Sequence, residues 1–87
     1  MRTVWKYDVP IDDEVHTHLI PNDDRIVGVG LQRPNVVTFW CEVNPKRAAP
    51  ERAFVVIGTG HRVPHLGQHL GLVFDGPFVW HLYEVPS

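Results

Sequence analysis

Prolines and glycines are spread along the whole chain, and they constrain its fold more than any other feature. The 87 residues include eight prolines and seven glycines, so residues that break helices recur too often for a long helix to form. The apolar segments between them are short and rich in Val, Ile, Phe, Trp and Tyr, which favour strands. The sequence therefore predicts an all-β domain with at most one short helical turn.

Seven short segments have the character of strands. They are residues 3–9, 14–20, 25–32, 36–43, 53–57, 71–74 and 78–85. Turn residues at 33–35 (Arg-Pro-Asn) and 75–77 (Asp-Gly-Pro) predict two hairpins, and residues 21–24 (Pro-Asn-Asp-Asp) predict a further turn. We expect the helical turn, if there is one, at residues 65–70. Strands of this spacing favour a small antiparallel β-sandwich or barrel that takes up residues 1–87 as a single domain.

Side-chain patterns within these strands add two details. Alternation puts Trp5, Tyr7 and Val9 on one face of the first strand. Gly28 and Gly30 fall on one face of the third strand, which predicts a bulge or close packing by an aromatic ring, with Trp40 as the candidate ring.

Composition limits where the chain acts and what it binds. Cys41 is the only cysteine, so no intramolecular disulfide can form, and a reducing cytoplasm is the expected location. No apolar run approaches the roughly 18 residues of a membrane span, and the start of the chain lacks the pattern of a signal peptide. A domain of this size buries only about 60–70% of its unfolded surface, so we expect self-association to add burial.

Charge is unevenly distributed along the chain, although the net charge is only −2. Residues 1–24 carry six acidic side chains against two basic ones, and residues 25–62 carry six basic side chains against two acidic ones. Duplex DNA binding needs a dense basic surface, which this balance does not supply. A solvated, charge-balanced surface is the simpler interpretation, and a local anion site in the middle segment is the alternative.

One motif stands out as a candidate site for a ligand or partner. The apolar strand at 53–57 runs into Gly58, Thr59, Gly60, His61 and Arg62. Paired glycines expose backbone N–H groups to anions, and His and Arg add a titratable and a bidentate donor. Arg47 and Arg52 are candidate neighbours. Neither a Walker pattern nor a G-x-G-x-x-G fingerprint follows, so a tight turn whose side chains face water is the structural alternative.

Histidines are the chain's main candidates for metal binding or catalysis. Two sets of histidines have metal-ligand spacing: His16 and His18 on one strand face, and His61, His65 and His69 at four-residue intervals. No H-E-x-x-H motif or cysteine cluster accompanies them, so the sequence predicts neither a metal site nor a cofactor. A small metal-dependent hydrolase remains the alternative function.

Nucleophilic catalysis has even less support from the sequence. Ser87 is the last residue, and Cys41 is expected to be buried and inert. Thr59 would act only if a base reached it, and His61 is the nearest histidine in sequence.

Trp5 and Trp80 lie on the first and last strands. We expect them in the core or at a subunit interface, and the alternative is an exposed platform for a nucleobase or peptide.

Three segments together resemble a known family. They are the opening strand with Trp-Lys-Tyr at 5–7, the segment Ile-Gly-Thr-Gly-His-Arg-Val-Pro at 57–64, and the closing strand at 78–84. In this order they resemble small uncharacterised proteins encoded by bacteriophages and prophages, including those of actinobacteria. The resemblance implies action inside a bacterial host, by binding a host protein or sequestering a nucleotide signal. A minor structural protein of the virion is the alternative that it leaves open.

Overall fold

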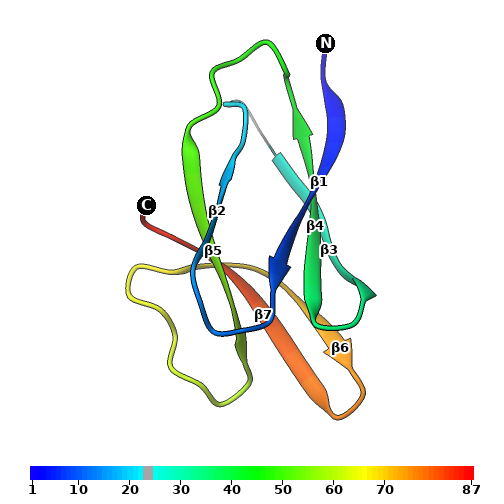
Figure 1. Ribbon diagram of the computed structural model, residues 1–87, viewed down its shortest axis with the longest axis vertical. Helices are drawn as coiled ribbons and strands as arrows, with labels where there is room; N and C mark the ends of the chain where they lie inside the picture. Colours follow the sequence, from blue (N-terminus) through cyan, green and yellow to red (C-terminus); the bar gives the residue numbers. More distant parts are fainter. Residues whose placement is uncertain (23–24) are drawn as a thin grey trace.

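The computed structural model describes residues 1–22 and 25–87, which form seven strands in two antiparallel sheets (Figure 1). The strands are β1 (Thr3–Pro10), β2 (His16–Leu19), β3 (Arg25–Arg33), β4 (Val36–Val43), β5 (Glu51–Gly58), β6 (Gln68–Asp75) and β7 (Phe78–Val85). The predicted all-β fold is confirmed, and the two separate sheets make it a sandwich rather than a closed barrel. The turn predicted at 21–24 includes residues 23 and 24, which lie outside the described residues. No helix in the described part of the chain is long and apolar enough to cross a membrane.

Each hairpin keeps its two strands in one sheet, but the hairpins alone do not fix the sheets to which β1, β2 and β5 belong. One sheet has the order β1-β4-β3, and the other has the order β2-β5-β7-β6. Both predicted hairpins are confirmed, as β3–β4 and β6–β7. The connection from β4 to β5 crosses between the sheets, so that β5 lies between β2 and β7. This order places the end of β5 beside the start of β7.

Alternate residues of the central strands form the core. On β4, the side chains of Val37, Phe39, Cys41 and Val43 are buried, as expected for a strand with one inner face. Cys41 is fully buried, as predicted. The Phe39 ring meets the Phe54 ring of the other sheet at a centroid distance of 4.7 Å, which joins the two layers.

Each open side of the sandwich is held by one close contact between the sheets. On one side, β3 and β6 approach so closely that a Cβ atom at Gly71 would lie 2.7 Å from Cγ2 of Val29. On the other side, the His18 imidazole of β2 makes a 2.8 Å hydrogen bond to the backbone oxygen of Asp8 in β1 and packs 5.2 Å from the Tyr7 ring. The second contact satisfies a backbone acceptor on an edge strand.

The expected details of β3 are found, and the two terminal tryptophans differ in burial. The β3–β4 register shifts between Ile26 and Gly28, and a Cβ atom at Gly30 would lie 3.2 Å from the Trp40 ring. The strand therefore has both a bulge and close packing against an aromatic ring. Trp5 is 42% exposed and lies outside the core, whereas Trp80 is half-buried and packs against it.

The helical turn expected at residues 65–70 does not form. The N–H of Gly67 donates to the oxygen of Pro64 at 3.0 Å, and Leu66 adopts a positive φ of 55°. These values describe a tight turn, after which the chain enters β6 at Gln68. Gln68 and His69 pair with Glu84 and Tyr83 of β7, so tertiary structure outweighs the weak local preference for helix.

Candidate functional site

The five residues of the predicted motif form one turn at the end of β5, which we call the 58–62 turn. The His61 N–H donates to the Gly58 oxygen at 3.1 Å, and the Thr59 N–H donates to the oxygen of Val79 on the neighbouring strand at 3.2 Å. Gly60 has a φ of 93°, a value that side-chain-bearing residues rarely adopt. The glycine therefore allows a turn that holds Thr59 and His61 exposed at the end of the strand.

A hollow of about 270 Å³ lies on one side of this turn, and we call it the aromatic hollow. It is lined by Gly58, Thr59, His61, Pro77, Phe78, Val79 and Trp80. The turn supplies its polar groups, and the first residues of β7 supply its apolar wall. Ligand pockets usually combine an apolar lining with a few polar groups in this way, although most are somewhat larger, from about 300 Å³ upward.

Packing around Trp80 makes the wall of the aromatic hollow rigid. The Phe78 and Trp80 rings are nearly parallel, with centroids 5.6 Å apart. The indole N–H of Trp80 donates to Oδ2 of Asp75 at 3.1 Å, which fixes the orientation of the ring. A Cβ atom at Gly58 would lie 3.2 Å from the indole, so the glycine lets Trp80 lie against β5. Phe78 remains 57% exposed and presents a ring surface to solvent.

A second hollow, of about 190 Å³, shares Gly58, Thr59 and His61 with the first. We call it the histidine hollow. Its remaining lining residues are Ile57, Gly60, Val63, His81 and Tyr83. The register of β5 and β7 pairs Ile57 with His81, so these two side chains lie on the same face of the sheet.

A chain of hydrogen bonds runs along the histidine hollow. The Thr59 hydroxyl lies 2.8 Å from Nε2 of His81, and Nδ1 of His81 lies 3.0 Å from Nε2 of His69. The sequence alone indicates His61 as the histidine nearest to Thr59, whereas in the structure the base beside Thr59 is His81. Pairing of β5 with β7 brings His81 to Thr59, and pairing of β7 with β6 brings His69 to His81. No spacing along the sequence indicates either contact.

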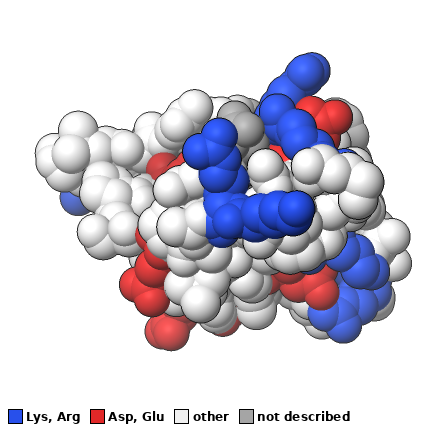
Figure 2. Space-filling model, turned by 90° about the horizontal axis from the view of Figure 1, so that it is seen from above, with Lys and Arg blue, Asp and Glu red and all other residues white. Residues whose placement is uncertain are grey.

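The structure does not bring the two candidate neighbours to the 58–62 turn. Arg52 lies six residues back along β5, about 20 Å away at the rise of a strand, and makes a bidentate ion pair with Glu84 at 2.6 and 2.7 Å. Arg47 belongs to the connection that precedes β5. Figure 2, which views the molecule from that end, shows Lys and Arg side chains there with acidic side chains beside them.

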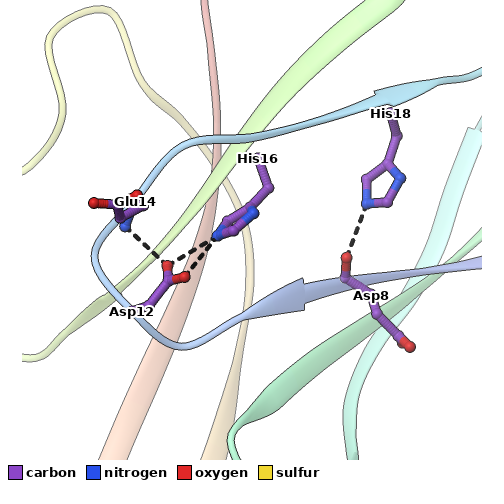
Figure 3. Close-up of polar contacts among 5 residues, drawn as sticks. All are labelled: Asp8, Asp12, Glu14, His16 and His18. Carbon is purple, nitrogen blue, oxygen red and sulfur yellow. Dashed lines mark hydrogen bonds and ion pairs between the residues drawn. The ribbon is translucent and has the colours of Figure 1, made fainter.

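The other histidine candidates have separate partners (Figure 3). Nε2 of His16 lies 2.9 Å from both carboxylate oxygens of Asp12, and His18 contacts the Asp8 backbone instead. The hydrogen bond from His16 lowers the pKa of Asp12, and the Glu14 N–H adds to this effect. His61, His65 and His69 do not lie on a common helix, because the chain turns at Pro64. Among residues 1–22 and 25–87, no three or more His, Cys, Asp or Glu side chains are grouped to hold a metal ion.

Comparison with known families now places the chain. A model described as "Domain of unknown function (DUF7352)" matches residues 1–87. The chain belongs to the DUF7352 family. No curated protein and no solved structure matches the chain significantly. Membership in DUF7352 covers the whole chain, so both hollows and the 58–62 turn lie within the family domain.

Proposed function

We propose that the protein is a binding module and that the 58–62 turn holds a small ligand with a planar ring and an anionic group, as in a mononucleotide. The observation that carries the proposal is the aromatic hollow, in which the Phe78–Trp80 wall faces the polar residues Thr59 and His61. Stacking on an aromatic side chain is worth about 1–3 kcal/mol per base in other proteins.

The anionic group of such a ligand would meet His61 and Arg62. Both side chains are exposed, and no ion pair of Arg62 is found among residues 1–22 and 25–87. A guanidinium binds phosphate through two parallel hydrogen bonds, and imidazole gains a positive charge on protonation. The proposal of a ring-binding surface beside an anion-binding one is supported by His61, which borders the aromatic hollow, and by Arg62, which follows it in the chain.

The resemblance to phage-encoded proteins supports a role inside a bacterial host. A protein of this kind would lower the free concentration of a nucleotide signal used in host defence, or would recognise a host factor that presents the same chemistry. We also propose that the protein self-associates. Leu72 and Phe74, which are 43% and 75% exposed on the edge strand β6, support this part of the proposal.

Isothermal titration calorimetry with AMP, adenosine and ribose 5-phosphate separates the two halves of the site. We expect AMP to bind at least tenfold more tightly than either fragment. The double variant His61→Ala/Arg62→Ala should reduce AMP affinity to that of adenosine, and Phe78→Ala should reduce it to that of ribose 5-phosphate.

Two exposed residues away from the turn provide the matched control, His65→Ala/Arg47→Ala, which should bind AMP like the wild type. The proposal is wrong if the His61→Ala/Arg62→Ala variant retains wild-type affinity for AMP, or if the wild type binds none of the three compounds.

A further inference from the structure

At the histidine hollow, the Thr59 hydroxyl is followed by two imidazoles in series: His81, which lines the hollow, and His69, which lies beyond its lining. The proposed binding function uses neither of these two histidines. We propose that Thr59 is a nucleophile activated by His81, and that the site transfers a small apolar acyl group from an activated ester to water. Enzymes that use Ser, Cys or Thr nucleophiles share this pattern, in which a base within hydrogen-bond reach is oriented by a third group. The two hollows share Thr59, but His81 and His69 do not line the aromatic hollow, so variants at these two histidines test this proposal separately from nucleotide binding.

The distances favour the hydroxyl as the reacting group. Thr59 Oγ1 lies 2.8 Å from Nε2 of His81, within the range expected of a nucleophile and its general base. Its second contact, with the Val79 oxygen, is longer at 3.4 Å. Thr59 is exposed and borders the hollow, so an incoming carbonyl carbon has access to its oxygen.

His69 is the positioning residue of this chain. When His81 Nδ1–H donates to His69 Nε2, at 3.0 Å, the lone pair of His81 Nε2 is left to accept the Thr59 proton. The same bond stabilises the imidazolium that His81 becomes during the reaction. The His69 ring is also held edge-on against Tyr83 at 5.1 Å, which fixes its orientation.

The remaining walls of the hollow indicate the size and chemistry of the substrate. Ile57, Val63 and Tyr83 supply mainly apolar surface, and a volume of about 190 Å³ admits a short acyl chain rather than a long one. Gly60 follows the nucleophile, and its N–H takes part in neither of the backbone bonds that close the turn. In other hydrolases the N–H of the residue after the nucleophile stabilises the oxyanion, and Gly60 would do so here.

The proposed reaction has two steps. In the first, Thr59 Oγ1 forms a bond to the ester carbonyl carbon while its proton moves to His81 Nε2, and the ester C–O bond breaks as the leaving alcohol takes up that proton. In the second, water attacks the acyl-Thr59 carbonyl and gives a proton to His81. The bond between Thr59 Oγ1 and the acyl carbon then breaks, and the hydroxyl regains its proton. The net reaction is ester plus water to acid plus alcohol, with no other reactant.

The test uses p-nitrophenyl acetate with the full-length protein. Release of p-nitrophenolate is followed by absorbance, and quenched protein is digested with trypsin. The tryptic peptide of residues 53–62 contains Thr59 as its only hydroxyl group, so an acetyl ester on this peptide locates the nucleophile. We expect that ester in the wild type, together with continued release of p-nitrophenolate after the first turnover.

Six variants separate catalysis from structure. Thr59→Val and His81→Gln should each lower kcat at least tenfold, Thr59→Ser should retain activity, and the control His65→Gln should match the wild type. His69→Ala should lower kcat with little change in KM, and His69→Gln, which keeps a hydrogen-bond acceptor, should restore part of it. Circular dichroism melts establish that each variant folds. Absence of the acetyl ester, or equal hydrolysis by folded Thr59→Val, would overturn the proposal.

Discussion

The close contact between β3 and β6 gives a quantitative test of how the sandwich closes. A Cβ atom at Gly71 would lie 2.7 Å from Cγ2 and 3.1 Å from Cβ of Val29, whereas non-bonded carbon atoms favour about 3.5–4.0 Å. Val29 is β-branched and stiff at χ1, so the side chain cannot rotate away cheaply. Overpacking of this kind costs about 1–3 kcal/mol, and replacing a strand glycine by alanine returns about 0.5–1 kcal/mol. We therefore expect Gly71→Ala to lower the free energy of unfolding by about 0.5–2 kcal/mol.

A double-mutant cycle attributes this loss to one contact. Val29→Ala alone should also destabilise the protein, because it removes two half-buried methyl groups. In the double variant, the new methyl group at position 71 occupies the space that the Val29 methyl groups leave. The free energy of unfolding of the double variant should therefore exceed the value predicted by adding the two single changes, by about 0.5–2 kcal/mol. Urea unfolding followed by tryptophan fluorescence measures all four proteins. An unchanged midpoint for Gly71→Ala, or strictly additive effects, would refute the reasoning.

Three further predictions test other contacts. The Thr38 hydroxyl donates to the Asp8 carboxylate at 2.7 Å and lowers the pKa of that carboxyl in the folded protein. Ionised Asp8 therefore stabilises the fold above the pKa of the unfolded chain, and this stabilisation is lost as pH falls through the lower pKa of the folded protein. Asp8→Asn should therefore destabilise the protein at pH 7, with a difference that shrinks in acid-titrated thermal melts. His18→Ala removes the bond that joins β2 to β1 and should cost about 1–3 kcal/mol, which thermal melts would show as a lower Tm. Phe74→Lys should shift self-association toward the monomer in light scattering, and a monomeric wild type would contradict that proposal.

Local features of the fold follow from the sequence because they depend on neighbouring residues. Alternation predicts β1, and turn residues predict both hairpins. The 58–62 turn was predictable for the same reason, since Gly60 permits the φ of 93° that it requires. Local preference favours a helical turn at residues 65–70, whereas Gln68 and His69 are in a strand because they pair with Glu84 and Tyr83, 14 or more residues away along the chain.

The composition of the candidate site depends instead on strand order. His81 reaches Thr59 because β7 pairs with β5, and Arg52 lies far from the turn because β5 is extended. Neither the choice of β7 as the partner of β5 nor its register is encoded in any short motif. Spacing along the sequence therefore favours His61 as the partner of Thr59, whereas the imidazole that contacts the Thr59 hydroxyl in the structure is His81.

We propose above all that the 58–62 turn and the aromatic hollow beside it bind a ligand with a ring and an anionic group. Nuclear magnetic resonance titration of ¹⁵N-labelled protein with AMP tests it most directly. We expect the largest amide shifts at residues 58–62 and 78–80, together with a shift of the Trp80 indole signal. Shifts centred instead on residues 44–52, or no saturable shift at any residue, would contradict the claim.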